Sequence, residues 1–122
     1  MSEDPVMGCR RMVGKVAVIA GAASGIGRAS ALRLAREGAA VVVGSPAGEK
    51  PLIDSLVAEI TGFGGSAHGA VFDATDEASI AALIDTAVGV YGGIDAVHAN
   101  FADLRVIFED SDIITVSDEV LE

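Results

Sequence analysis

The sequence predicts a single α/β domain built on a parallel β-sheet. Four apolar, β-branched runs recur along the 122 residues, and each of the first three precedes a segment with helical periodicity, as in consecutive βαβ units. A glycine-rich turn directly after the first run supports the same assignment. A chain of this length can bury roughly two-thirds of its unfolded surface, which suffices for one core and excludes two full domains. We expect a flexible tail over residues 1–13 and the domain over residues 14–122.

The first two strands are predicted at residues 16–20 (VAVIA) and 40–43 (AVVV). Both are continuous apolar runs, which is typical of strands covered on both faces of a sheet. The helix between them is predicted over residues 26–37, where alanine and other small residues favour close packing on the sheet. Gly38 is expected to end this helix.

The third and fourth strands are predicted at residues 69–73 (GAVFD) and 94–99 (IDAVHA). Two amphipathic helices are predicted from apolar stripes, Leu52, Leu56, Val57 and Ile60 for the second helix and Ile80, Leu83, Ile84, Ala87 and Val88 for the third. Thr75 is predicted as the N-cap of the third helix, with acidic residues in the first turn. A loop over residues 101–116 and a further helix from Ser117 are expected after the fourth strand.

The charge balance excludes one class of partner. The chain carries 18 acids and 8 bases, a net charge of −10, whereas nucleic-acid binding needs clustered Lys and Arg. Seven acids lie between Asp103 and Glu122. No run approaches the ~18 apolar residues of a membrane span, and residues 1–14 lack the apolar core of a signal peptide, so we expect a cytoplasmic protein. Cys9, the only cysteine, cannot form an internal disulfide or a multi-cysteine metal site.

The motif that carries chemistry is Gly21-Ala22-Ala23-Ser24-Gly25-Ile26-Gly27, between the first strand and the first helix. Such a turn directs free backbone N–H groups and the positive end of the helix dipole toward one point, which favours a phosphate. Glycines let the backbone approach a pyrophosphate and let helix and strand pack closely. Arg28 stands where a phosphate-binding loop of the ATPase type would need Lys, which disfavours that class.

On these residues the chain resembles the N-terminal half of a short-chain dehydrogenase/reductase. That family carries T-G-x-x-x-G-x-G after its first strand; here Ala20 replaces the Thr and the three glycines match. Asp73 matches the family's Asp after the third strand. The family's N-N-A-G motif corresponds to residues 99–102 (ANFA), in which only Asn100 is kept. The resemblance covers about residues 13–122 and implies a Rossmann-type sheet of order 3-2-1-4, truncated after the fourth strand.

The resemblance also implies a dinucleotide site. The pyrophosphate and adjoining ribose would be cradled by Gly21, Ser24, Gly25, Ile26 and Gly27. Asp73 and Ala74 would flank the adenine, and Asn100 would lie near the cofactor below the nicotinamide ribose.

The sequence leaves the choice between NAD and NADP open. At the tip of the second strand, Gly44-Ser45-Pro46 offers neither an acid for the NAD ribose nor an Arg for a 2′-phosphate. Ser45 could donate to either group, and Lys50 or Arg28 could supply charge for NADP.

Catalytic residues of the family are not found in this sequence. The family uses Y-x-x-x-K with a Ser, in which Lys lowers the pKa of the Tyr. The only tyrosine, Tyr91, has no Lys partner, and no Lys follows Lys50. His68 and His98 are two histidines without a third ligand, too few for a zinc site. Ser111 and Ser117 have no paired base. We therefore expect no catalytic residue, no metal and no turnover by this chain alone.

Two functions follow. The first is the NAD(P)-binding portion of an oxidoreductase that transfers hydride between a nicotinamide cofactor and an alcohol or carbonyl. The alternative is a non-catalytic nucleotide-binding or interaction module that uses its acidic C-terminal stretch or an exposed strand edge. In the order 3-2-1-4 the fourth strand is an edge, so unpaired backbone groups beside Val97 and Ala99 would favour self-association.

Overall fold

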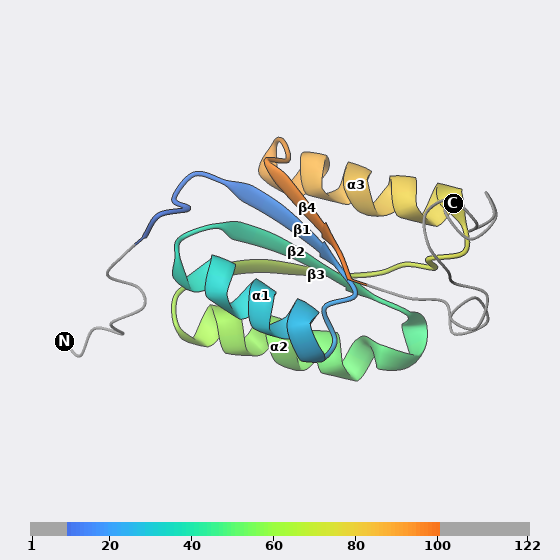
Figure 1. The fold of residues 1–122 in the computed structure, drawn as a ribbon, viewed down its shortest axis with the longest axis horizontal. Coiled ribbons are helices and arrows are strands. Elements are labelled where there is room, and N and C mark those ends of the chain that lie inside the picture. Colours follow the sequence, from blue (N-terminus) through green and yellow to red (C-terminus); the bar gives the residue numbers. More distant parts are fainter. Residues whose placement is uncertain (1–9, 101–122) are drawn as a thin grey trace, which may run out of the picture.

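The computed structural model describes residues 10–100 of the chain, which form one four-stranded sheet with three helices (Figure 1). Along the chain the elements are β1 (Val16–Ala20), α1 (Gly25–Arg36), β2 (Ala40–Ser45), the short 3-10 helix η1 (Ala47–Glu49), α2 (Lys50–Gly62), β3 (Ser66–Val71), α3 (Glu77–Tyr91) and β4 (Ala96–Ala99). The loop and the helix predicted after residue 100 lie outside the described residues.

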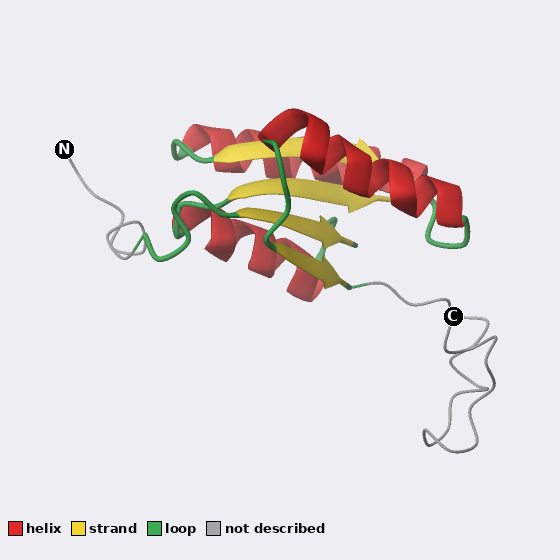
Figure 2. Cartoon of the chain, turned by 90° about the horizontal axis from the view of Figure 1, so that it is seen from above, coloured by secondary structure: helices red, strands yellow, loops and turns green. Residues whose placement is uncertain are grey.

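The strands are all parallel and follow the order β3-β2-β1-β4, which confirms the predicted Rossmann-type sheet. The central strand β1 pairs with β2 from Val16 opposite Ala40 and with β4 up to Ala20 opposite Ala99. Helices cover both faces of the sheet (Figure 2). On one face lies α3, while α1 and α2 share the opposite face.

The core consists of two apolar layers, one on each face of β1 and β2. Ile19, Val41 and Val43 pack toward α1 and α2, whereas Val18 and Val42 pack toward α3. Every residue of β1 is buried, as the continuous apolar run predicts. This two-sided burial fixes β1 as the centre of the molecule, so the turn that follows it leaves from a rigid strand.

The two outer strands differ from their predicted limits. β3 begins at Ser66, three residues before the predicted start, because its backbone pairs with β2 while Ser66 and His68 remain exposed at the edge. An edge strand needs no apolar side chains at exposed positions such as these two. The apolar pattern of the sequence therefore did not predict that they belong to the strand. β4 begins at Ala96, two residues later than predicted, because Ile94 packs into the α3 layer before the strand starts.

Three helix assignments also needed correction. Leu52 is 46% exposed and Ile53 is buried in its place, whereas the predicted Leu56 and Ile60 are buried on α2. Val88 is 48% exposed on α3, where Leu83 and Ala87 are the buried residues. The N-cap of α3 is Asp76, which accepts from the Ala78 N–H at 3.0 Å, and not Thr75.

The described part of the predicted tail is held against α1. The Met12 N–H donates to the Glu37 carbonyl oxygen at 2.8 Å, and the guanidinium of Arg11 donates to the Glu37 carboxylate at 3.0 Å. Gly38, with φ +101°, ends α1 as predicted. Over residues 10–100 no helix has both the length and the apolar character that crossing a bilayer requires.

Candidate cofactor-binding site

The candidate site lies where the parallel strands end. Because all four strands run in one direction, the residues that follow β1, β2, β3 and β4 meet at a single edge of the sheet. From β1 the chain moves outward through β2 to β3 and then returns to place β4 on the other side of β1. In open α/β sheets, ligands bind at the carboxyl edge beside such a reversal of strand order. Here that reversal lies between β1 and β4.

The glycine-rich turn is anchored to β2 by its backbone. Gly21 takes φ +93°, and its N–H donates to the Gly44 carbonyl oxygen at 2.9 Å. The Ala22 N–H donates to the same oxygen at 3.0 Å, and the side chain of Ala22 is fully buried. The turn is therefore a fixed part of the sheet edge.

The first turn of α1 has an open N-terminus. Ser24 is the N-cap, but its side chain makes no capping hydrogen bond, and the first turn contains no acid. Gly25 takes φ +59°, and Ile26 is 71% exposed. Helical geometry leaves the first N–H groups without intrahelical partners, and the dipole favours an anion there. This arrangement suits a phosphate group.

Gly27 allows the close approach of α1 to the strand ends. A Cβ atom at this position would collide with the carbonyl oxygen of Gly21 and would lie 2.9 Å from Nδ2 of Asn100. Any larger side chain would therefore push α1 away from the turn. This contact is the geometric reason for the third glycine of the motif.

Asn100 ties the end of β4 to the same turn. Its backbone N–H donates to the Ala20 carbonyl oxygen at 2.7 Å, and its side-chain Nδ2 donates to the Gly21 carbonyl oxygen at 3.3 Å. The structure thus brings together Gly21, Gly27 and Asn100, which are remote in sequence. Asn100 is half-buried and lies directly after β4.

Asp73 lies at the same edge, after β3. Its Oδ1 accepts hydrogen bonds from Thr75 Oγ1 at 2.6 Å and from the Thr75 N–H at 2.9 Å, and these bonds lower its pKa. The Asp73 N–H donates to Ser79 Oγ at 2.7 Å. Thr75 and Ser79 were not among the predicted site residues, although Asp-x-Thr is the spacing of such a side-chain turn. Ala74 is half-buried and packs on the α3 layer.

The polar side chains near the end of β2 are either neutral or already paired with an acid. Ser45 is fully buried, and its hydroxyl donates to the Pro46 carbonyl oxygen at 3.2 Å. Arg28 pairs with Glu59 at 3.1 Å, and Lys50 pairs with Asp54 at 2.9 Å. Arg28 and Lys50 are the two bases that the sequence offers for a 2′-phosphate, and each already contacts a carboxylate.

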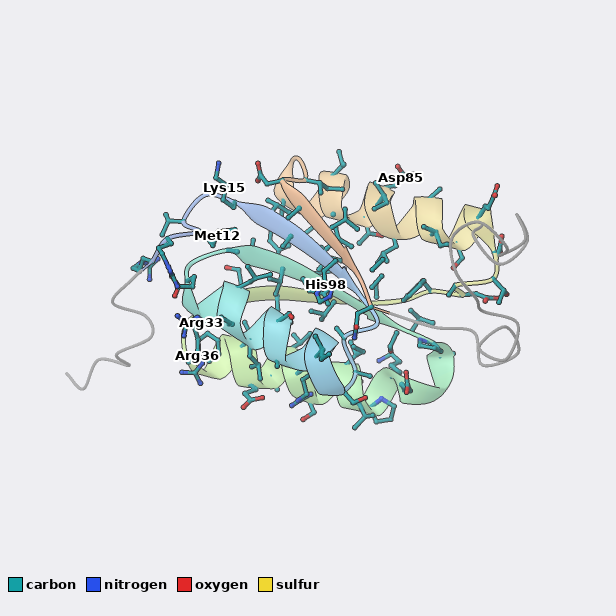
Figure 3. The ribbon with its side chains drawn as sticks, viewed as in Figure 1. Met12, Lys15, Arg33, Arg36, Asp85 and His98 are labelled. Carbon is teal, nitrogen blue, oxygen red and sulfur yellow. The ribbon has the colours of Figure 1, made fainter. Side chains whose placement is uncertain are left out.

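The other side chains that the sequence offers for chemistry are Tyr91, His68 and His98. Tyr91, at the end of α3, is half-buried, and this burial raises its pKa. His68 is exposed on β3, and His98 lies on β4 beside α1 (Figure 3). Within residues 10–100 no group of His, Cys, Asp or Glu could hold a metal ion. Ser111 and Ser117 lie outside the described residues.

Comparison with known sequences identifies relatives of this chain. The family model described as short chain dehydrogenase matches residues 15–113. A 3-oxoacyl-[acyl-carrier-protein] reductase, FabG, of Thermotoga maritima is 42% identical over 90 residues, which cover 74% of this chain and 36% of that protein. The 2,5-dichloro-2,5-cyclohexadiene-1,4-diol dehydrogenase LinX of Sphingobium indicum is 46% identical over 84 residues, covering 69% of this chain and 33% of LinX.

Solved structures of dehydrogenases are also similar to this chain. A dehydrogenase/reductase from Sinorhizobium meliloti 1021 aligns with a TM-score of 0.74 and 31% identity, over 95% of this chain and 46% of that one. A hydroxysteroid dehydrogenase from Escherichia coli aligns with a TM-score of 0.66 and 33% identity, over 77% of this chain and 37% of that one. The chain spans about a third of the length of the curated relatives that it matches. By its fold, its glycine motif and these relatives, the chain belongs to the short chain dehydrogenase family.

Proposed function

We propose that this chain is the NAD(P)-binding portion of a dehydrogenase or reductase that acts on an alcohol or carbonyl substrate. The observation that carries the proposal is the uncapped N-terminus of α1 beside the turn that Asn100 and Gly44 hold in place. A dinucleotide presents a pyrophosphate, which fits N–H donors and a helix dipole. When bound, the cofactor supplies the hydride acceptor or donor.

The predicted site residues have a role in this proposal, except Ser45, whose side chain is fully buried. Gly21, Gly25 and Gly27 let the backbone approach the pyrophosphate, while Ser24 and Ile26 project from the same turn and first helical residues. The adenosine half would lie toward the ends of β2 and β3, where Ser45, Asp73 and Ala74 stand. The nicotinamide half would lie toward Asn100 at the end of β4.

We further propose that this chain does not transfer hydride alone. The one tyrosine, Tyr91, ends α3, whereas the candidate site lies at the other end of that helix, where Asp73 and Asp76 precede it. No Lys follows Lys50 to lower the pKa of a tyrosine. A binding assay is therefore the direct test of function.

The test of cofactor binding is a titration of the chain with NADH and with NADPH, followed by fluorescence or calorimetry. The informative variant is Ser24→Asp, because Asp is a favourable N-cap that maintains the helix while its charge repels the pyrophosphate. We expect a loss of about tenfold or more in affinity, equivalent to about 1.4 kcal/mol. Ser24→Asn, a neutral N-cap of the same shape, is the matched control and should lose far less. Absence of binding by the folded wild-type chain at millimolar nucleotide would refute the proposal.

We also propose self-association through β4. Within the described residues this strand pairs only with β1. The strand includes Val97, which is 55% exposed, and it contains no Lys or Pro that would block pairing at its outer edge. Light scattering at micromolar concentration should give a mass above that of the monomer. Val97→Lys should reduce this mass, whereas Val71→Lys, at the opposite edge on β3, should not. A monodisperse wild-type monomer would contradict the proposal.

A further inference from the structure

The turn between β3 and α3 is held by hydrogen bonds at both of its ends. The Phe72 N–H donates to the Ser45 carbonyl oxygen at 3.0 Å, which ties the turn to the end of β2. The Asp73 N–H donates to Ser79 Oγ at 2.7 Å, and the Asp73 carbonyl oxygen accepts the Asp76 N–H at 3.1 Å. These bonds tie the turn to the start of α3. Asp73 is therefore an exposed acid on a backbone that the neighbouring elements hold in place.

The side chain of Asp73 is oriented by Thr75. The hydroxyl of Thr75 at 2.6 Å and its backbone N–H at 2.9 Å donate to the same carboxylate oxygen, Oδ1. These bonds restrict the rotation of the carboxylate and so the direction in which Oδ2 points. From residues 10–100, Oδ2 of Asp73 accepts no hydrogen bond. The bonds from Thr75 also lower the pKa of Asp73, so its carboxylate is ionised near neutral pH and can only accept hydrogen bonds.

We propose that Thr75 is a positioning residue for base recognition, which holds Oδ1 of Asp73 and leaves Oδ2 to accept the exocyclic amino group of an adenine. This inference rests on the proposed function, in which the adenosine half of the cofactor lies toward the ends of β2 and β3. Adenine carries an amino donor where hypoxanthine carries a carbonyl oxygen. A carboxylate oxygen at that position accepts from adenine and repels hypoxanthine. A site built to bond an N–H group rejects an analogue that lacks it.

Thr75 contributes to recognition by ordering the carboxylate before the nucleotide binds. An exposed Asp side chain can adopt several rotamers, and fixing it on binding costs free energy. The hydroxyl bond of Thr75 reduces this cost. It also determines what an amide would present at the same position, because in Asp73→Asn the donors of Thr75 retain the amide oxygen. The amide N–H groups of the variant would then stand where Oδ2 of Asp73 stands.

The test compares the dissociation constants of NADH and of its hypoxanthine analogue, measured by calorimetry on the full chain. If the chain binds only NADPH, the 2′-phosphorylated pair takes their place. We expect the wild-type chain to bind the adenine nucleotide about fivefold or more tightly, as one hydrogen bond to a carboxylate allows. Asp73→Asn should invert this preference, because its amide N–H groups donate to the carbonyl oxygen of hypoxanthine.

Three threonine substitutions test the role of Thr75. Thr75→Val removes the hydroxyl and keeps the backbone bond, so the ratio of the two dissociation constants should fall about twofold or more. Thr75→Ser keeps the hydroxyl and should retain the wild-type ratio. Thr86→Val is the matched control, because the Thr86 hydroxyl donates to the Ala82 carbonyl oxygen further along α3. Its ratio should equal that of the wild-type chain.

The outcomes distinguish this inference from the proposed function. If the folded wild-type chain bound none of these nucleotides, both would be refuted. Equal affinity of the wild-type chain for the adenine and hypoxanthine nucleotides would overturn the inference and leave the proposed function intact. The same holds if Thr75→Val lost affinity for both nucleotides by one factor, because an unchanged ratio would mean that the hydroxyl has a structural role only.

Discussion

At the scale of single residues, Gly27 matters both for the packing of α1 and for the shape of the candidate site. A Cβ atom there meets the Gly21 carbonyl oxygen and the amide of Asn100, so α1 must shift if the position is filled. We expect Gly27→Ala to lower the free energy of unfolding by about 1–3 kcal/mol, as overpacking does, and to abolish nucleotide binding. Urea denaturation and an NADH or NADPH titration measure the two effects.

The control for this substitution is Gly89→Ala. Gly89 is also helical, but nothing lies within 4 Å of its Cβ position. Ala is the better helix former, so this variant should gain up to about 1 kcal/mol and leave nucleotide binding intact. Equal stability of the two variants would show that the contact of Gly27 with the turn is not tight.

Glu37 is predicted to make stability depend on pH. Hydrogen bonds from Arg11 lower its pKa from 4.5 to about 2, so the ionised form stabilises the folded state. A carboxyl group whose pKa falls on folding contributes fully above its unfolded pKa and loses its contribution as pH falls toward the folded value. Glu37→Gln should therefore lower the urea midpoint at pH 7, and the difference from wild type should shrink between pH 4.5 and about 2.

The matched control is Glu59→Gln, which breaks the more exposed pair with Arg28. Exposed pairs contribute about 0–1 kcal/mol, so its urea midpoint should shift less than that of Glu37→Gln at pH 7. If the difference between Glu37→Gln and wild type stayed constant from pH 7 to pH 2, Glu37 would not be the titrating group.

At the scale of elements, Asp95 joins the start of β4 to the central strand β1 through two hydrogen bonds. Its Oδ2 accepts the Val16 N–H at 2.8 Å, and its own N–H donates to the Val16 carbonyl oxygen at 2.8 Å. Asp95→Ala removes the first bond and keeps the second, so we expect a loss of about 1–2 kcal/mol in urea denaturation. Asp54→Ala, which removes an exposed pair within α2, should cost less than about 0.5 kcal/mol. Equal losses would mean that Asp95 does not hold β4.

The start of α3 depends on Asp76. Its carboxylate accepts the Ala78 N–H, which satisfies one of the free donors of the first turn. Asp76→Ala should lower the free energy of unfolding by about 1 kcal/mol in thermal or urea denaturation. Asp85→Ala, in the exposed middle of the same helix, is the control and should be neutral or slightly stabilising, since Ala has the higher helix propensity. A loss as large in Asp85→Ala would contradict the capping role.

Element limits were predictable only where burial required apolar residues. The buried strand β1 has the limits that its sequence predicts, because each of its five residues must be apolar. The edge strand β3 does not, since Ser66 and His68 join it through backbone hydrogen bonds alone. Thr75 and Asp76 are both good N-caps by type, and the bonds of Thr75 to Asp73 leave Asp76 to cap α3.

At the scale of the whole molecule, stability should fall from the centre of the sheet to its edges. β1 is buried and paired on both sides, whereas β4 is largely exposed and pairs with one strand. We expect amide hydrogen exchange to be slowest in β1 and β2 and faster, on average, in β4. Exchange in β4 as slow as in β1, in a monomeric sample, would mean that another segment covers this edge.

The sequence by itself determined the parallel sheet and the glycine turn, because buried strands and tight turns admit few residue types. It also placed Gly21 directly after β1 and Gly25 and Gly27 at the start of α1. Only the tertiary structure decided which distant groups complete that turn, since the bonds of Asn100 to Ala20 and Gly21 join residues 79 or more positions apart. The same holds for the pairing of Arg28 with Glu59, because the direction of a charged side chain depends on the packing of two helices.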